Sequence, residues 1–386
     1  MAFLSGGHAA TDLSQGAIAA LLVFLRPELG LSYTELTAVV LVATISSSIV
    51  QPLFGMWSDN RGTAWLLPVG VAVSGIGIAL ASVAPSYPLL LLCVAVSGIG
   101  VAAYHPEASK FARYVSGTRR AGGMSWFSIG GNVGFALGPL VASTIVLTLG
   151  LRGGLLLAVP PVIVAVLLVF VTPYLMQFVP EKATTTSGSG ERDRPRALVL
   201  LLTIVSFRSL GHMGLFVFIP LWEVSKGHGE GYGSRLLFLF LLAGAVGTLI
   251  GGPLADRIGT RLVTGASHAL SVPLILIYVL VGGVAGAIAV ILAGGLIIAT
   301  FAVTLVMSQE YMPNRVGLAS GLSIGFSIGL GGVAAVTLGV IADGVGIKTA
   351  VLATLFGPAV AAILTLFLPA TAEKKAMLPA AVGVPA

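Results

Sequence analysis

The chain has 386 residues, of which 56% are hydrophobic and only 9% are charged, and its mean hydropathy is +1.04. A soluble globular domain carries roughly 25% charged residues, so this composition excludes a protein whose whole surface faces water. The net charge of +6 is typical of a multispan membrane protein with basic loops, and we do not expect nucleic-acid binding. The single cysteine, Cys93, excludes an intramolecular disulfide and does not suggest a metal cluster.

Apolar segments of about 20 residues, the length that crosses a bilayer as a helix, follow one another along the chain. No alternating segments of a membrane barrel occur between them. The first six segments lie at 6–26, 36–57, 63–84, 87–112, 121–149 and 151–177, and the second six at 197–221, 233–254, 261–282, 284–309, 316–343 and 346–368. We therefore predict an all-α membrane protein with twelve transmembrane helices in two pseudo-symmetric six-helix bundles.

One long polar stretch, 181–196, separates the two sets of segments. Its Ser, Thr, Gly and charged residues are typical of a flexible linker. The predicted organisation is a bundle at 1–178, a linker at 179–196, a second bundle at 197–369 and a flexible tail at 370–386.

The orientation follows from the placement of lysine and arginine. With both termini inside, fourteen of these residues fall in cytoplasmic loops and the tail, and five fall on the opposite side. The twentieth, Arg208, lies inside the seventh apolar segment. This positive-inside bias predicts an inner (plasma) membrane protein with both termini in the cytoplasm.

The two halves repeat each other. The stretch 55–64 matches 252–261 at an offset of 197, sharing two glycines, an aspartate and a threonine. The stretch 122–130 matches 317–325 at an offset of 195, sharing two serines, an isoleucine and two glycines. Parallel six-helix repeats are the construction of one large class of secondary transporter.

These motifs identify a family resemblance that covers nearly the whole chain outside the linker and tail. The G-x-x-x-D-x-x-G pattern after the second and eighth segments resembles the signature loop of the major facilitator superfamily, and 134–139 (GFALGP) resembles the antiporter motif of its drug:proton exporters. Four stretches are similar to the fosmidomycin-resistance group of bacterial exporters: His8-x-x-x-Asp12, Gln51-Pro52, His105-Pro106-Glu107 and 309–322. The first signature loop departs from the family pattern, because it lacks the second basic residue that Arg261 supplies in the other half.

Acidic residues inside the spans are the candidate proton-coupling groups. A carboxylate in hydrocarbon is costly, so Asp12 and Glu107 are expected to face a cavity or a partner, and either can take up a proton. His105 precedes a proline that breaks the helix beside Glu107. The alternatives are a structural ion pair of Glu107 with Lys110, and a structural hydrogen bond or ion pair of Asp12 with a neighbouring serine or Arg208.

Arg208 is the central basic candidate, because its guanidinium offers a fork for a phosphonate, phosphate or carboxylate. The alternative is a permanent salt bridge to Asp12 or Glu107, which could itself break on protonation. His212 lies one turn further along, and His8 one turn before Asp12. The candidate substrate-binding set is Arg208, His8, His212, Gln51, Asn132 and Gln309, although the neutral members are equally consistent with bonds between helices.

A third group of residues is predicted to act in conformational change by capping, kinking or close helix packing. It comprises Asp59, Asp256, Arg257, Arg261, Pro106, Gly134, Gly138 and Pro139. No phosphate-loop motif occurs, which argues against an ATP-driven pump, and no hydrolase elbow or zinc-protease motif suggests an enzyme. We expect no cofactor and no metal site.

The predicted function is proton-coupled export of a small organic solute or drug by alternating access. A proton-linked importer of a metabolite is the alternative, and a membrane sensor that does not transport is a third reading. The expected partners are a small-molecule substrate, protons and the lipid bilayer, and the superfamily resemblance implies a monomer.

Overall fold

The computed structural model describes residues 1–60, 63–116, 120–178 and 192–369, and these residues form helices and short connections without strands. The first group of elements is α1 (Ala2–Leu29), α2 (Tyr33–Ser48), α3 (Gln51–Asn60), α4 (Leu66–Ala81), α5 (Tyr87–Val115), α6 (Arg120–Gly153), η1 (Gly154–Ala158), α7 (Val159–Leu175) and η2 (Met176–Phe178). The second group is α8 (Pro195–Ser225), α9 (Glu230–Ile258), α10 (Thr260–Leu280), α11 (Gly283–Tyr311), α12 (Val316–Val345), α13 (Ile347–Ala353) and α14 (Phe356–Thr365).

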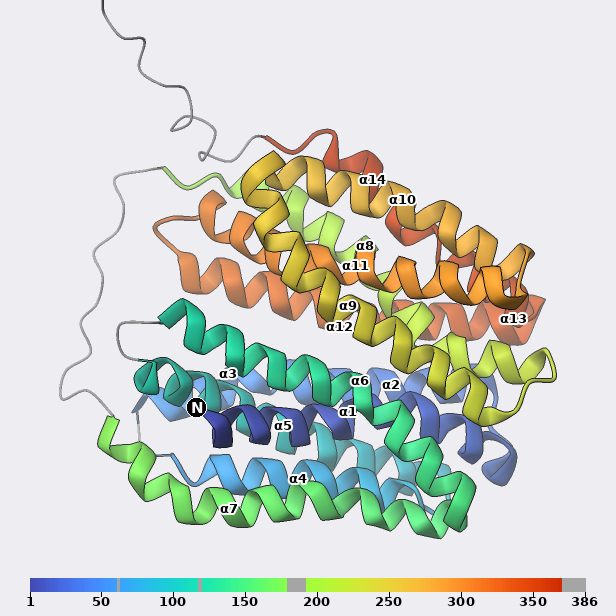
Figure 1. The fold of residues 1–386 in the computed structure, drawn as a ribbon, viewed down its shortest axis with the longest axis horizontal. Helices are drawn as coiled ribbons and strands as arrows, with labels where there is room; N and C mark the ends of the chain where they lie inside the picture. Colours follow the sequence, from blue (N-terminus) through green and yellow to red (C-terminus); the bar gives the residue numbers. More distant parts are fainter. Residues whose placement is uncertain (61–62, 117–119, 179–191, 370–386) are drawn as a thin grey trace, which may run out of the picture.

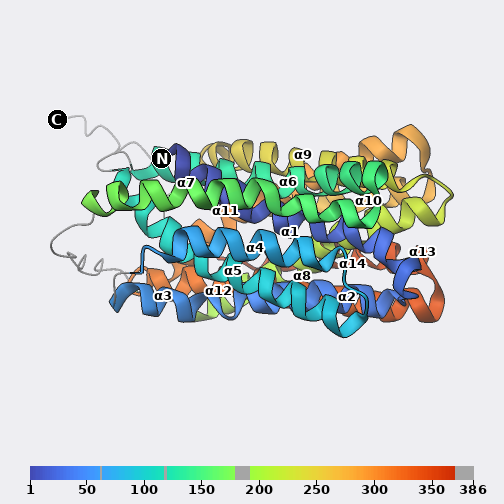
Figure 2. The same cartoon turned by 90° about the horizontal axis from the view of Figure 1, so that it is seen from below.

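The two groups of helices lie side by side with their long axes roughly parallel (Figures 1 and 2). We call the end that carries Met1, Asn60 and Arg194 the linker end, and the end that carries Ser32, Ser225 and Gly346 the distal end. Residues 179–191 of the predicted linker 179–196 and the predicted tail 370–386 lie outside the described residues, so the linker and the tail stay predictions, as do the exact bundle boundaries. The last two residues of the predicted linker, Pro195 and Arg196, belong to α8.

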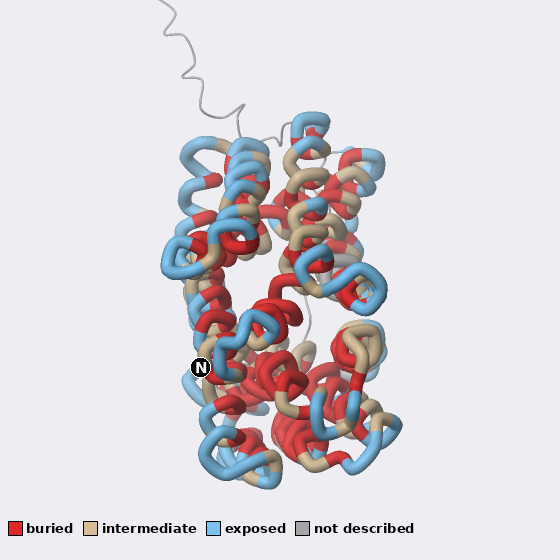
Figure 3. The backbone as a smooth tube through the Cα atoms, turned by 90° about the vertical axis from the view of Figure 1, so that its right-hand side faces the viewer, coloured by how far each residue is buried: buried red, intermediate tan, exposed pale blue. Residues whose placement is uncertain are grey.

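Long apolar helices dominate the described chain. Nine of its helices are long and apolar enough to cross a membrane, and Leu66–Ala81 and Gly329–Val345 are shorter apolar helices. Exposed residues lie on the outer sides of both groups, while buried residues gather within each group (Figure 3). Many of the exposed residues are large and apolar, including Phe170, Val284 and Phe367. This distribution is that of a multi-pass membrane protein, whose outer surface contacts lipid. The number of twelve crossings stays a prediction.

Prolines divide two of the predicted segments. The segment 36–57 is split into α2 and α3, because Pro52 has no N–H to donate and its ring opposes the carbonyl of Ser48. The segment 346–368 is split into α13 and α14 in the same way, with Pro358 opposite the carbonyl of Thr354. The breaks explain why these spans are less regular than an uninterrupted helix.

A glycine row on α6 packs directly on the backbone of α1. A Cβ at Gly130, Gly134 or Gly138 would lie within 2.6 Å of the carbonyl oxygen of Ser5, Ala9 or Leu13, respectively. Both rows advance by four residues, so each glycine meets the next turn of α1. This places the predicted conformational residues Gly134 and Gly138, with the neighbouring Pro139, at the α1–α6 contact and not at a ligand loop.

The two groups of helices meet at the distal end through α2 and α12. Asp343 of α12 accepts hydrogen bonds from the backbone N–H groups of Tyr33 and Thr34, both at 2.8 Å, and from the Thr34 hydroxyl at 2.6 Å. The carboxylate therefore caps the first turn of a helix in the other group. Close by, a Cβ at Gly339 would lie 2.2 Å from Oγ1 of Thr37, so α12 and α2 cross at close range.

The first testable prediction concerns this contact. Asp343→Ala removes a cap that is worth about 1 kcal/mol, so the distal end is expected to open more often. In a Cys93→Ser background with Thr37→Cys as reporter, a membrane-impermeant thiol reagent should label the distal end about fivefold faster when Asp343 is replaced. Equal labelling rates with and without Asp343 would show that the cap does not hold this end closed.

Candidate functional site

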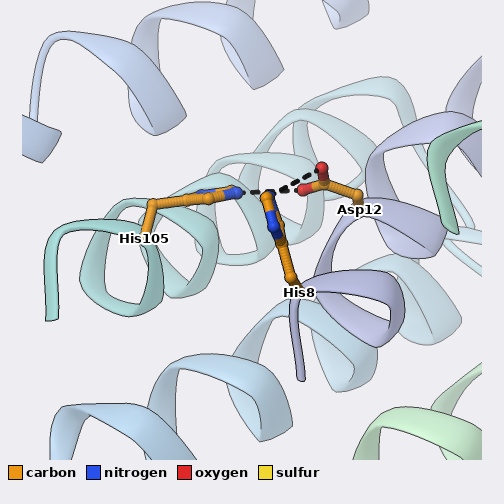
Figure 4. Close-up of side chains that lie close together, drawn as sticks. All are labelled: His8, Asp12 and His105. Atoms are coloured by element: carbon orange, nitrogen blue, oxygen red, sulfur yellow. Dashed lines mark ion pairs between the residues drawn. The ribbon is translucent and has the colours of Figure 1, made fainter. Parts of the chain in front are cut away.

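Three ionisable side chains meet where α1 and α5 pack together near the linker end (Figure 4). Nε2 of His8 lies 3.3 Å from Oδ2 of Asp12, one turn along the same helix. Nε2 of His105, from α5, lies 3.0 Å from Oδ1 of the same carboxyl group. We call these three residues the His–Asp–His cluster. Asp12 therefore has two histidines as its ion-pair partners, and the predicted alternative of a bridge to Arg208 is absent from this structure.

Backbone carbonyls decide which ring nitrogens carry hydrogen. Nδ1 of His8 lies 2.8 Å from the carbonyl oxygen of Phe127, and Nδ1 of His105 lies 3.0 Å from that of Val101. A carbonyl oxygen can only accept, so both Nδ1 atoms carry a hydrogen. Each Nε2 atom is then left to face Asp12.

The sign of these contacts depends on how many protons the three side chains hold. If both histidines were neutral and Asp12 ionised, nitrogen lone pairs would face carboxylate lone pairs, which is repulsive. One added proton makes one of the contacts attractive, and a second proton makes both attractive. Of the two contacts, only the one between His105 and Asp12 joins α5 to α1, so a proton held there makes that contact between the helices attractive.

The surroundings of the cluster keep it compact without sealing it. The ring of His8 stacks on Phe127 with centroids 4.2 Å apart. On the α6 side, a Cβ at Gly131 would lie 2.4 Å from Nε2 of His8 and 2.7 Å from Oδ2 of Asp12. A side chain at this position would displace His8 and Asp12 from the arrangement described above. The three side chains of the cluster remain 13–17% exposed, so they are not completely covered by the protein.

The same three residues offer ligand types that transition metals use. Their ligand atoms all lie within 4.8 Å of one another, and a hydrogen bond from Nδ1 to a carbonyl is also found in histidines that bind metal. A proton can occupy the same place as a metal ion. One added proton gives a positive histidine beside the negative Asp12, so the charges within the cluster balance. A chelator removes a metal ion but not a proton, so adding one shows which of the two the cluster holds.

Glu107 sits two residues beyond His105 and faces another way. Its Oε2 atom lies 2.8 Å from Nζ of Lys110 and accepts a hydrogen bond from the Thr63 hydroxyl at 3.1 Å. Its side chain is 1% exposed. The ion pair with Lys110, one of the two sequence-based alternatives, is therefore present. Thr63 belongs to the first signature loop, so Glu107 ties α5 to that loop, while Pro106 packs near Gly55 of α3.

Arg208 lies in the second group of helices at a position equivalent to Asp12 in the first. It is 196 residues further along the chain, within the range of the repeat offsets. The side chain is 2% exposed and donates from Nη1 to the Thr304 hydroxyl at 3.1 Å. Its guanidinium carbon lies 4.3 Å from the ring centroid of Phe301. A buried cation on an aromatic face, with a hydroxyl beside it, is suited to an anionic group.

Two further histidines lie within electrostatic reach of Arg208. The predicted residue His212 lies one turn along α8 and stacks parallel to Phe240 at 6.1 Å, with its Nε2 atom buried and without a hydrogen-bond partner among the described residues. His268 of α10 is fully buried, with Nε2 3.5 Å from the Thr300 hydroxyl. His268 was not among the residues predicted from the sequence, although an imidazole inside an apolar segment is a usable signal.

The other predicted residues are spread over the fold. Gln51 is at the α2–α3 break, Asn132 follows Gly131 on α6, and Gln309 is near the linker end of α11; all three are partly buried. Asp256 and Arg257 are exposed in the last turn of α9, and Arg261 donates to the carbonyls of Thr365 and Leu366 at the end of α14. The side chain of Asp59 lies outside the described residues.

A second charged cluster lies at the distal end, and the sequence analysis did not identify it. Glu223 of α8 is 1% exposed. It accepts from Lys226 and from the Tyr278 hydroxyl, both at 2.8 Å, and from Nδ1 of His228 at 2.6 Å. These contacts satisfy both carboxylate oxygens and join the α8–α9 turn to α10, so the cluster fastens the distal end of the second group.

A profile of the Major Facilitator Superfamily matches residues 4–335. The chain belongs to the major facilitator superfamily. It is therefore a transporter that acts on small molecules and not an enzyme, as the signature loops predicted. The match includes the cluster on α1 and α5 as well as Arg208 on α8.

Individual relatives of this major facilitator transporter are similar over most of its length. It is 31% identical over 370 residues to the "Uncharacterized MFS-type transporter YfnC" of Bacillus subtilis strain 168, with 92% of this chain and 88% of the relative covered. It is 31% identical over 352 residues to the "Fosmidomycin resistance protein" of Escherichia coli strain K12, with 89% and 86% covered. The predicted resemblance to that group is confirmed.

The fold is also that of solved transporters. A bacterial homologue of the human lysosomal transporter Spinster, in an inward-facing and occupied conformation, superposes with a TM-score of 0.79 at 14% sequence identity, covering 95% of this chain and 96% of the other. The predicted major facilitator fold is thereby confirmed.

Proposed function

We propose that this transporter exports a small organic anion in exchange for protons across the inner (plasma) membrane, with both termini in the cytoplasm. The His–Asp–His cluster supports the proton coupling, Arg208 supports the anionic cargo, and the name of the Escherichia coli relative supports export. The excess of basic residues in the loops of the linker end supports the orientation.

The observation that carries the proposal is the pair of histidine contacts on one carboxyl group. Because both Nδ1 atoms donate to carbonyls, the contacts of Asp12 are attractive only when at least one proton is added. Histidine has an ordinary pKa of about 6.5, which suits exchange near neutral pH. In this proposal Asp12 and His105 carry the coupled proton, and His8, first predicted to bind substrate, shares it.

Cargo and protons act on opposite halves of the protein. Asp12 and Arg208 occupy equivalent helices of the two repeats, α1 and α8, which also contact each other. Protons entering from outside add charge on the α1 side, while an anion neutralises charge on the α8 side. Each ligand therefore changes the charge on one of the two groups of helices. Alternating access couples the movement of protons to the movement of the anion. The α2–α12 contact at the distal end supports an inward-facing arrangement here.

The test is transport in proteoliposomes under an imposed pH gradient, with a pH-sensitive dye inside. The probes are fosmidomycin, an alkylphosphonate, a carboxylate and an uncharged amide. Antiport predicts that anion movement drives protons the opposite way. Movement of both in the same direction would replace this proposal with a proton-linked importer. Loss of proton-coupled transport on adding a chelator, with recovery on adding Zn²⁺, would assign the cluster to a metal instead.

A second prediction distinguishes the two acids of α5 and α1. Glu107→Gln keeps the hydrogen bond from Thr63 possible but removes the charge that pairs with Lys110, so we expect the stability in detergent to fall by about 1–3 kcal/mol. Proton-driven uptake by the folded fraction should keep its pH dependence. A flat pH profile in Glu107→Gln would move the proton-coupling role from Asp12 to Glu107.

A further inference from the structure

Tyr104 precedes His105 on α5 and is fully buried. Its hydroxyl donates to the backbone carbonyl of Leu4 on α1 at 2.6 Å. This is a direct hydrogen bond between α1 and α5, the two helices that form the His–Asp–His cluster. Proton coupling by His8, Asp12 and His105 does not itself involve this bond.

The ring has little room to move. A Cβ at Gly7 of α1 would lie 2.3 Å from the Tyr104 hydroxyl oxygen. A Cβ at Gly70 of α4 would lie 2.9 Å from the backbone nitrogen of Tyr104 and 3.0 Å from its Cβ atom. Glycines on two neighbouring helices thus allow close approach: Gly7 to the phenol ring, and Gly70 to the backbone from which the side chain of Tyr104 starts.

The bond from Tyr104 lies in register with the cluster. Leu4, His8 and Asp12 are spaced by four residues and so follow one face of α1. Tyr104 binds the first of these turns, while His105 reaches Asp12 two turns on. The hydrogen bond between Tyr104 and Leu4 therefore sets the distance between Asp12 and His105.

We propose that Tyr104 is a positioning residue for the proton site: it sets the spacing of α1 and α5 so that His105 reaches Asp12. The inference rests on the proposed function, because it assigns Tyr104 a role in proton coupling. Asp12 is faced by His8 from α1, by His105 and Tyr104 from α5, and by the backbone of Gly131 from α6. Of these, Tyr104 forms the hydrogen bond that fastens α5 to the backbone of α1.

The test uses Tyr104→Phe, which removes one oxygen atom and keeps the ring. Tyr114→Phe is the matched control, because Tyr114 lies on the same helix, is partly buried and contacts Phe111. Two rates are measured in proteoliposomes with fosmidomycin as the first probe: exchange of probe at equal pH, and uptake driven by a pH gradient. Exchange of the probe at equal pH requires no net movement of protons. Uptake driven by a pH gradient requires protons to cross the membrane.

For Tyr104→Phe we expect exchange within about twofold of the natural protein, and driven uptake about three- to tenfold lower, the range set by one hydrogen bond. The pH at half-maximal driven uptake should also move, whereas Tyr114→Phe should change neither rate. Equal losses in both rates would show a merely structural role and overturn the inference, as would a driven uptake unchanged from the control.

Asp12→Asn, measured alongside, separates this inference from the function on which it rests. If Asp12→Asn abolishes driven uptake and Tyr104→Phe does not alter it, only the positioning role is wrong. If Asp12→Asn leaves driven uptake intact, the proton site itself is wrong and the role of Tyr104 is overturned with it.

Discussion

Asp12→Asn is expected to reduce pH-gradient-driven transport by about 100-fold, toward the upper end of the coupling between two sites in one protein. The substitution keeps the size of the side chain but removes its charge and its ability to exchange a proton. His8 and His105 then face a neutral amide in place of a carboxylate. Exchange of cargo at equal pH should persist within a few-fold, because the cargo site on α8 is unchanged.

Glu28→Gln is the control for this experiment, because Glu28 is an exposed acid on the same helix. It should transport at the normal rate with the normal pH profile. The dye signal in the same vesicles reports proton movement directly. Normal proton movement through Asp12→Asn would place the coupling outside the His–Asp–His cluster.

Arg208→Lys is expected to raise the KM for an anionic probe about tenfold or more, because hydrogen bonds to charged groups are worth about 1.5–3 kcal/mol. Lysine keeps the charge and loses the planar fork that binds two oxygens at once. The contacts to Thr304 and Phe301 hold the guanidinium in place, and an ammonium cannot reproduce them together. The measurement is initial uptake of an alkylphosphonate across a range of concentrations.

Arg235→Lys is the matched control, since Arg235 is exposed on α9. The uncharged amide in the probe panel provides a second comparison, because a cargo without an anion should not depend on the fork. A loss that is equal for charged and uncharged probes would assign Arg208 to the stability of the α8–α11 contact and not to cargo recognition.

Much of the fold was predictable because the bilayer imposes a simple rule. Backbone groups in lipid must be paired within the segment, so long apolar runs become helices. The segments predicted at 87–112 and 284–309 correspond to α5 (Tyr87–Val115) and α11 (Gly283–Tyr311). The breaks at Pro52 and Pro358 were less visible, because a proline inside a span can either kink a helix or end it.

The candidate site was only half visible in the sequence. The spacing of His8 and Asp12 placed them on one face, because four residues make about one helical turn. Nothing in the sequence placed His105 opposite Asp12, since His105 is 93 positions further along the chain. Glu107 lies only two residues from His105, yet its carboxylate meets Lys110 and Thr63 and not the His–Asp–His cluster.

The sequence by itself determined the membrane location, the repeat and the family, because these follow from hydropathy, matched motifs and local spacing. Only the tertiary structure decided which polar groups meet: Asp12 with two histidines, Glu107 with Lys110 and Thr63, and Arg208 with Thr304. The contacts of Asp12 with His8 and of Glu107 with Lys110 lie within single helices, and their spacing is visible in the sequence. The contacts of Asp12 with His105, Glu107 with Thr63 and Arg208 with Thr304 join separate segments, and they depend on how the helices pack. Helix packing sets the rotation and the axial position of one helix relative to another. A local sequence pattern carries no information on either.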